Sequence, residues 1–455
     1  MRTQIFFASS LYGAATVAAA LDAGCFDAAD RRVLLVSNNA ATPETSPSLD
    51  KMAGFERLRD RFDRVLSWND AIRPFHPGGW SPRADDVPLW ERHLRLLWGL
   101  GEPHQDPVEL IVESIQVNPA LALCQMFPEA PVDVYADGLM SYGPTRNKLD
   151  PLVGTRVRRV LHLDLLPGLR PLLLTEFGVA PETVPTSAFK AVLAELTADV
   201  PPSVTARAAK SPPPALLLGQ YMSALDILSA DEEERLHVRM LRGAVALGHR
   251  RVVFKPHPVA PARHSRVLEK EAGELGVELT VLDDPVLAEV LYERLRPALV
   301  VGCFSTALMT ASAFYGLRVA RTGTDLLLER LKPYQNSNRV PVTLVDALLP
   351  DLDDPAAVES WRAPDAERVS SELTGLVRTV GFCMQAQIYP DLRPEAERFL
   401  STKLNERTWP YFKRRRLTAL GLPGAVPSQL SFLPRNAVVR RVARRARAIK
   451  RGTLG

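Results

Sequence analysis

The sequence of 455 residues contains only four cysteines, and no two of them form a CxxC pair. Cys25, Cys124, Cys303 and Cys383 stand far apart, which argues against a disulfide framework and against a zinc site. We interpret them as buried free thiols of a protein in a reducing cytoplasm. The sequence also lacks GxGxxG, P-loop and HExxH motifs, and no internal repeat is visible.

Long hydrophobic runs are also missing, and none approaches the ~20 residues that a membrane-spanning helix needs. The N-terminal apolar segment could pass for a signal peptide, but Ser9, Ser10 and Gly13 interrupt it and only one positive side chain precedes it. We predict instead a strand over residues 5–8 and a helix over residues 12–22. The composition, 46% hydrophobic and 24% charged, is that of a soluble globular protein, and the length suggests two or three domains.

Acidic side chains are nearly absent from the C-terminal end. Residues 401–455 carry 14 Lys and Arg and one acid, Glu406, whereas the preceding residues carry 42 basic and 51 acidic side chains. The acidic body excludes a fold built around nucleic acid, and the basic end predicts a separate role. Residues 436–451 have an apolar helical face opposite a face of arginines, formed by Val438, Val442, Ala446 and Ile449. Such a helix suits an anionic membrane surface, with nucleic-acid binding or simple disorder as the alternative.

Short apolar runs alternate with segments long enough for a helix, which predicts parallel α/β sheets. The strands predicted in the first half are residues 31–39, 64–68, 109–114, 132–137 and 157–163. A Pro-, Ala- and Ser-rich stretch then interrupts the pattern, as an interdomain linker does. The strands predicted after it are residues 214–220, 250–258, 277–284, 297–305 and 316–322.

We therefore predict an α/β fold of two Rossmann-like parallel-sheet domains facing a cleft, the GT-B-like arrangement of many nucleotide-sugar transferases. The acceptor-side domain would span residues 1–196 and the nucleotide-binding domain residues 215–350, with residues 197–214 as the linker. Residues 351–420 would form helices that pack back across the domains, and residues 421–455 a basic amphipathic helical tail.

Ligands of open parallel sheets bind beyond the carboxyl ends of the strands, and three predicted strand ends carry reactive side chains. The first is Tyr135–Gly138, where the strand delivers Asp137 at its tip and Gly138 permits a sharp turn. A carboxylate there can act as a general base, and partial burial improves it by raising its pKa. An ordinary Asp-Gly turn is the alternative.

The second strand end, Phe254–Pro258, holds His257 between two prolines that restrict the backbone. An imidazole held in this way can donate to a phosphate and stabilise a departing nucleotide. The alternative is a surface histidine in a Pro-rich loop. That alternative is what we expect for His76, whose His-Pro pair follows no predicted strand.

The third strand end, Gly302–Thr306, is followed by an apolar helix. The hydroxyls of Ser305 and Thr306, with backbone N–H groups at a helix N-terminus, form an anion site. Plain N-capping by Ser305 is the alternative, and the two roles can coexist. Asp351 and Asp353 resemble a metal-binding DxD motif, but they lie between prolines, where we expect a turn or a helix cap.

In their order and spacing these three strand ends resemble the bacterial alpha-2,8-polysialyltransferase family and its bacterial sialyltransferase relatives, over roughly residues 1–350. The resemblance implies an inverting, metal-independent glycosyltransferase that moves sialic acid, or a related acid sugar, from a CMP-sugar donor to a glycan or glycolipid acceptor. It implies no cofactor. With the basic tail, it implies a cytoplasmic protein held peripherally on the inner face of the cell membrane, without a nucleic-acid partner.

The resemblance also implies roles for single residues. Asp137 would deprotonate the acceptor hydroxyl, His257 would bind or protonate the departing CMP phosphate, and Ser305 and Thr306 would hold that phosphate. The other candidate binding residues are Gly138, Gln220, Lys255, Pro258 and, as a ligand of the nucleotide ribose, Glu289. The chain departs from the family at the first acidic position of the first motif, which is Ala136 here.

Two other functions fit the same residues. A CDP-glycerol phosphotransferase of cell-wall polymer synthesis also carries a KPHP strand end and a downstream serine loop. A catalytically inactive, membrane-attached protein would keep the nucleotide site without turnover. Release of CMP, measured with and without acceptor, separates an enzyme from the inactive protein.

Overall fold

The structure is a computed structural model, and it describes residues 1–202, 206, 212–257, 260 and 263–425. Pro258 and the predicted tail helix at 436–451 lie outside the described residues, as does most of the middle of the predicted linker.

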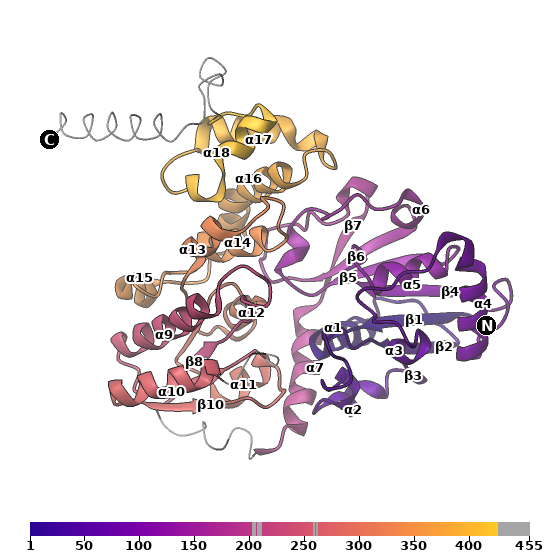
Figure 1. Ribbon diagram of the computed structural model, residues 1–455, viewed down its shortest axis with the longest axis horizontal. Coiled ribbons are helices and arrows are strands. Elements are labelled where there is room, and N and C mark those ends of the chain that lie inside the picture. The colour runs from indigo at the N-terminus through magenta and orange to yellow at the C-terminus, as the bar shows by residue number, and fades with distance from the viewer. Residues whose placement is uncertain (203–205, 207–211, 258–259, 261–262, 426–455) are drawn as a thin grey trace.

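Seven parallel strands form the sheet of the first domain, in the order β3-β2-β1-β4-β5-β6-β7 (Figure 1). Their bounds are β1 Thr3–Ala8, β2 Arg31–Val36, β3 Arg64–Ser67, β4 Val108–Glu113, β5 Val132–Ala136, β6 Val157–Leu163 and β7 Ala180–Val184. In register, Ile5 of β1 lies beside Val33 of β2 and Leu110 of β4. The strands predicted in this half are confirmed. The edge strand β7 was missed because its sequence, APETV, contains a proline and is mostly exposed.

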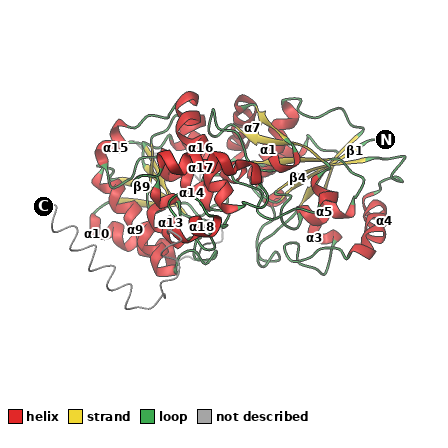
Figure 2. Cartoon of the chain, turned by 90° about the horizontal axis from the view of Figure 1, so that it is seen from above, coloured by secondary structure: helices red, strands yellow, loops and turns green. Residues whose placement is uncertain are grey.

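Helices cover both faces of this sheet, because successive side chains of a strand point to opposite faces. Phe6 and Ala8 of β1 pack into one core and Ile5 and Phe7 into the other. Figure 2 shows these layers, with α1 and α7 on one side of the strands and α3, α4 and α5 on the other. The helices of this domain are α1 Leu11–Asp22, α2 Phe55–Arg59, α3 Trp68–Ala71, α4 Val87–Trp98, α5 Ala120–Met126, α6 Pro151–Gly154 and α7 Thr186–Asp199.

Helix α1 confirms the structural interpretation of the N-terminal apolar segment. The Ser10 hydroxyl caps it by accepting from the backbone N–H of Gly13 at 3.0 Å, and its alanines are buried against the sheet. None of the helices within the described residues combines the length and apolar character needed to cross a membrane.

Five parallel strands form the second sheet, in the order β10-β9-β8-β11-β12. The strands are β8 Ala215–Leu218, β9 Arg251–Lys255, β10 Glu278–Val281, β11 Leu299–Gly302 and β12 Val319–Arg321. Their helices are α9 Ala230–Ala246, α10 Arg263–Leu275, α11 Ala288–Leu295, α12 Thr306–Tyr315, α13 Thr324–Arg330 and α14 Arg339–Leu348. The order of strands reverses between β8 and β11, which places a ligand-binding crevice at their carboxyl ends. The two sheets confirm the predicted fold class.

Among the described residues, four more helices follow those of the second sheet, and of these α16 reaches back to the first domain (Figure 1). They are α15 Pro355–Ser360, α16 Ala366–Met384, α17 Arg393–Lys403 and α18 Arg414–Leu420. Just after α16, the phenol oxygen of Tyr389 accepts from the backbone N–H of Thr145 at 2.9 Å and donates to the Glu176 carboxylate at 2.6 Å. Short 3-10 helices complete the chain: η1 Leu49–Lys51, η2 Ala84–Asp86, η3 Leu139–Tyr142, η4 Thr175–Phe177, η5 Pro390–Leu392 and η6 Trp409–Tyr411.

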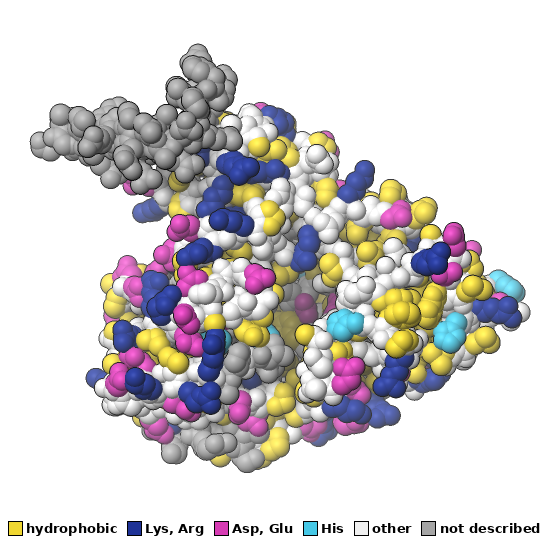
Figure 3. Space-filling view, viewed as in Figure 1, with side chains coloured by type: hydrophobic (Ala, Val, Ile, Leu, Met, Phe, Trp, Pro, Cys, Tyr) yellow, Lys and Arg dark blue, Asp and Glu magenta, His cyan; other side chains and the backbone are white. Residues whose placement is uncertain are grey.

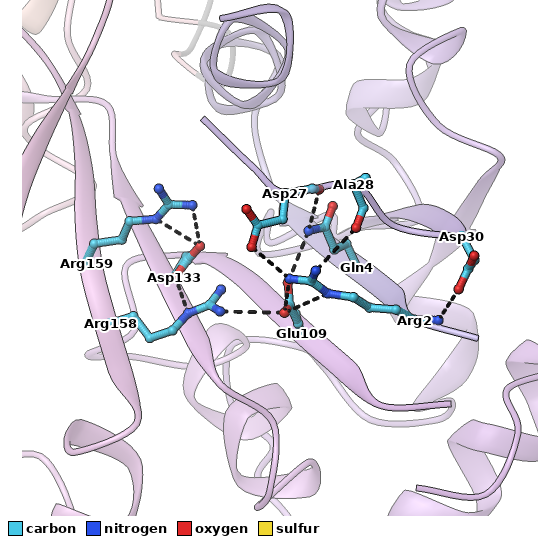
Figure 4. Close-up of polar contacts among 9 residues, drawn as sticks. All are labelled: Arg2, Gln4, Asp27, Ala28, Asp30, Glu109, Asp133, Arg158 and Arg159. Carbon is cyan, nitrogen blue, oxygen red and sulfur yellow. Dashed lines mark hydrogen bonds and ion pairs between the residues drawn. The ribbon is translucent and has the colours of Figure 1, made fainter. Parts of the chain in front are cut away.

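A charged network ties together the amino ends of the central strands of the first sheet (Figure 4). The buried Asp133 carboxylate pairs with Arg158 and Arg159, each at 2.9 Å. Glu109 pairs with Arg2 at 2.5 Å. Because these carboxylates are matched by guanidinium groups, this edge of the sheet is satisfied internally, and the candidate chemistry lies at the opposite, carboxyl edge.

The aspartates of the DxD-like segment are engaged in structural contacts. Asp351 pairs with Arg321 at 2.9 Å, and Asp353 pairs with Arg239 at 2.5 Å. The prediction of a turn is confirmed, since the Asp351 side chain accepts from the backbone N–H of Asp353 at 3.0 Å. Across the part of the chain that the structure describes, no group of three or more His, Cys, Asp or Glu side chains is placed to hold a metal ion. All four cysteines are free thiols.

Candidate active site

A cavity of about 460 Å³ lies between the carboxyl edges of the two sheets. Figure 3 shows the surface hollowed between the two domains. The walls come from the segments that follow β4 and β5 in the first domain and β8, β9 and β11 in the second. The cavity residues that the sequence predicted are Asp137, Gly138, Gln220, His257, Ser305 and Thr306.

Asp137 stands directly after β5, at the wall that the first domain contributes. Burial raises the pKa of its carboxyl group from the usual 3.8 to about 6, because removal from water disfavours the charged form. A carboxylate with this pKa is still mostly ionised at neutral pH, and it accepts a proton more readily than an exposed aspartate.

A second carboxyl group, which the sequence analysis missed, lies beside it. Glu113 ends β4 and is in register with Tyr135 of the neighbouring strand β5. Burial raises the pKa of Glu113 to about 7, and the charge of Asp137 adds to the rise, while hydrogen bonds from Ser9 oppose it. Its position at the end of the predicted strand 109–114 was a usable signal, but only the strand order shows that β4 adjoins β5.

The hydrogen bonds around Tyr135 indicate where the Glu113 proton lies. The Tyr135 phenol oxygen is 2.8 Å from the carbonyl oxygen of Phe7 and 3.2 Å from Oε2 of Glu113. A phenol has one proton, and a carbonyl can only accept. Both contacts are satisfied when protonated Glu113 donates to Tyr135 and Tyr135 donates to Phe7. Near neutral pH, Asp137 is therefore mostly ionised, whereas Glu113 still carries its proton in part of the molecules.

This arrangement predicts a pH-dependent stability. The folded protein retains the Glu113 proton between its ordinary pKa of 4.5 and about 7, whereas the unfolded chain loses it. The free energy of unfolding therefore falls as pH rises through this window. The side chain of Glu113→Gln is neutral at every pH and keeps a donor for Tyr135. The melting temperature of this variant, relative to that of the wild type, should therefore increase as pH rises from about 5 to about 8. Thermal unfolding of both proteins checks this, and parallel pH curves would contradict it.

Gly138 sits where the first domain meets the second. The backbone N–H of Leu139 donates to Oγ1 of Thr306 at 3.3 Å, and a Cβ atom added to Gly138 would lie 3.1 Å from the same oxygen. The φ angle of Gly138 is −131°, in the extended region that any residue adopts. The chain bends at Gly138 as predicted, but without a left-handed conformation, and the close approach of the second domain is what favours a glycine.

Ser305 and Thr306 begin α12 at the opposite wall of the cavity. The Ser305 hydroxyl accepts from the backbone N–H of Ala307 at 3.2 Å, so the expected cap is present. Gln220 follows β8, and its Oε1 accepts from the backbone N–H of Phe304 at 3.0 Å. This bond spans the point where the strand order reverses and orients the loop that leads into α12.

His257 lines the cavity just beyond β9. Burial lowers the pKa of its imidazole, the charge of Lys255 lowers it further, and Glu233 opposes the shift. The ring is therefore mostly neutral at neutral pH and presents one N–H donor. His76, the histidine of the other His-Pro pair, is exposed and does not line the cavity.

Two predicted binding residues point elsewhere. Lys255 is 7% exposed, and its ammonium donates to the carbonyl oxygen of Asp284 at 2.7 Å. Burial lowers its pKa to about 8. Glu289 is 3% exposed and accepts from the Thr310 hydroxyl at 2.7 Å, which joins α11 to α12. Neither side chain belongs to the cavity wall.

A comparison with models of known protein families finds one match. A family model described as alpha-2,8-polysialyltransferase matches residues 4–323. No curated protein matches the chain significantly.

Among solved structures, a UDP-GlcNAc 2-epimerase from Methanocaldococcus jannaschii shares 12% identity at a TM-score of 0.44, covering 74% of this chain and 93% of the other. The GT-B domain of a sialyltransferase from Photobacterium damselae shares 11% identity at a TM-score of 0.39, covering 76% and 96%. Because both likenesses are this distant, neither bears on the function.

Proposed function

The chain belongs to the alpha-2,8-polysialyltransferase family and is a glycosyltransferase, and from this premise we propose its reaction. It transfers sialic acid, or a related acid sugar, from a CMP-sugar to a glycan acceptor, with inversion at the anomeric carbon and without a metal ion. The observation that carries the proposal is the meeting of Asp137 with His257 and Ser305 in one interdomain cavity. A base from one domain thereby faces phosphate-binding groups from the other.

On the acceptor side, Asp137 removes the proton of the attacking hydroxyl. The bond from the acceptor oxygen to the anomeric carbon forms as the bond from that carbon to the CMP phosphate oxygen breaks. The proton passes to Asp137, and the electron pair leaves with CMP. The raised pKa of Asp137 suits this step, because the carboxylate is ionised at the start and basic enough to accept the proton.

On the donor side, the phosphate lies against the N-terminus of α12. The Ser305 and Thr306 hydroxyls and the positive end of the helix dipole favour an anion there. The neutral His257 imidazole donates its N–H to the same phosphate and stabilises the charge that develops on it. Gln220 keeps the loop before α12 in place. Since Glu289 is bonded to Thr310, we build the nucleotide site without it and without Lys255.

The nucleotide preference tests this proposal. A ligand that binds the folded protein raises its melting temperature, so CMP should stabilise the protein more than CDP, UMP or UDP. CMP should be released from a CMP-linked acid sugar when a glycan acceptor is added, and EDTA should leave the rate unchanged. Preference for CDP with glycerol-phosphate transfer would overturn the proposal. Binding of CMP without turnover in the presence of acceptors would identify the inactive protein instead.

We also propose that the basic C-terminal residues hold the enzyme on an anionic membrane, where a lipid-linked acceptor would be concentrated. The support is the charge of residues 401–455, with 14 basic side chains and one acid. Each Lys or Arg near an anionic bilayer contributes about 1 kcal/mol, and salt screens the attraction.

The full chain should therefore sediment with anionic liposomes at low salt and be released at high salt. A chain truncated after Gly424 should stay in the supernatant and still act on short acceptors in solution. Equal sedimentation with neutral and anionic liposomes, or none with either, would contradict membrane attachment.

A further inference from the structure

One charged side chain of the cavity wall, Arg146, belongs to none of the three strand-end motifs. Among the described residues, Arg146 is the only Lys or Arg that lines the reaction cavity. It also lines an adjoining cavity of about 680 Å³, whose wall is rich in amide side chains such as Asn336 and Gln387. Arg146 therefore stands at the junction between the site of reaction and a second polar hollow.

The backbone of Arg146 is held in place from two directions. Its N–H donates to the side-chain oxygen of Gln116, which follows β4. Its carbonyl oxygen accepts from the side-chain amide of Gln385, just beyond α16 and 239 residues away in sequence. Two glutamine side chains thus position this residue, which lies in a loop without helix or strand.

The charge of Arg146 has no counter-ion in the structure. Its Nη2 donates to the hydroxyl of Ser337 at 2.7 Å, a neutral group of the second domain. Its Nε is buried without a hydrogen-bond partner. Within the described part of the chain, no carboxylate lies within 4.0 Å of the guanidinium, whereas Arg31, Arg159 and Arg321 are all paired with acids. A positioned and unpaired cation at a cavity wall suits an anionic group of a ligand.

The proposed reaction, on which this inference rests, brings two kinds of anion into the cavity. The phosphate of CMP is accounted for by α12 and His257, at the wall of the second domain. No group described so far accounts for the carboxylate on the anomeric carbon of an acid sugar. A planar guanidinium binds such a carboxylate through two parallel hydrogen bonds. We propose that Arg146 binds the carboxylate of an acid sugar and so makes the enzyme select acid sugars over neutral ones.

Two sugars can bring this carboxylate: the one being transferred and the one at the end of the acceptor. The position of Arg146 at the junction of the two cavities is compatible with both sources. The experiment therefore varies the carboxylate separately on each substrate. In the donor arm, a CMP-linked acid sugar is compared with its carboxamide. In the acceptor arm, an oligosaccharide ending in an acid sugar is compared with the methyl ester of that terminal residue.

Arg146→Met should lower kcat/KM for the unmodified substrates by about 100-fold, because a hydrogen-bonded ion pair is lost. The decisive result is a loss of discrimination. Wild type should strongly prefer the carboxylate in one of the two arms, while Arg146→Met should use the two forms in that arm at similar rates. Arg146→Lys should restore part of the preference. The arm in which discrimination disappears identifies the sugar.

Lys148→Met provides a matched control, since Lys148 is an exposed cation that lines only the adjoining cavity. It should keep the discrimination of wild type in assays with short acceptors. Arg146→Met should still be stabilised by CMP alone, which shows that the variant is folded and holds the nucleotide. Equal rate losses of Arg146→Met with charged and neutralised substrates in both arms would overturn the assignment. Absence of CMP binding and release in wild type would instead overturn the proposed function itself.

Discussion

Asp137→Asn should lower kcat/KM for transfer by about 1,000-fold, the scale on which a positioned general base contributes. The amide has the size of the carboxylate but cannot accept the proton of the acceptor hydroxyl. CMP binding should be nearly unchanged, because Asp137 lies on the wall of the first domain and the proposed nucleotide-binding groups lie on the second. In wild type, kcat/KM should rise as pH passes about 6, where Asp137 ionises.

Steady-state transfer rates and CMP-induced thermal shifts would measure the two effects separately. Asp164→Asn is a suitable control, because Asp164 follows the next strand, β6, and does not line the cavity. It should transfer at the wild-type rate. If Asp137→Asn retained full activity, the base would have to be another group, and the ionised form of Glu113, whose pKa is about 7, would be the first to examine.

His257→Ala should weaken CMP binding and lower kcat/KM by about 100-fold, because the phosphate loses a donor both in the bound substrate and in the departing group. The loss should therefore appear in binding and in turnover. This pattern differs from that of Asp137→Asn, which should affect turnover alone.

Titration with CMP and steady-state kinetics would test the two parts of this expectation. His76→Ala removes the histidine of the other His-Pro pair, whose Nε2 lies 2.9 Å from the carbonyl oxygen of Ala40 in an exposed loop. It should leave CMP binding and kinetics unchanged. If His257→Ala had the same kinetics as the wild type, the second strand end would have a structural role only.

The sequence by itself determined the two parallel sheets and the three strand ends at which the candidate side chains lie. Buried strands such as β5 and β9 can be recognised in the sequence as apolar runs. In parallel sheets, ligands bind at the residues that directly follow such strands. The edge strand β7 was not predicted, because most of its side chains are exposed and its sequence therefore lacks a continuous apolar run. Local capping is also encoded in the sequence, since the Ser229 hydroxyl and the Glu232 carboxylate, three residues apart, form the capping box that begins α9.

Only the tertiary structure decided which of these residues share a site. Lys255 and Glu289 belong to suitable motifs, yet the fold turns them toward Asp284 and Thr310, because a buried charged or polar group takes the nearest partner. The pairing of Glu113 with Tyr135 depends on the adjacency of β4 and β5, which local sequence does not encode.

The contacts between domains are the clearest case. The side chain of Thr306, in the second domain, lies so close to Gly138 that a larger residue would crowd it. The side-chain amide of Gln385 donates to the carbonyl oxygen of Arg146, although the two residues are 239 positions apart in the sequence. Hydrophobic periodicity reports the environment of a residue within its own helix or strand. It does not report which distant surface the packed domains bring against that residue. In this protein the packed domains bring the candidate base Asp137 opposite the proposed phosphate-binding groups.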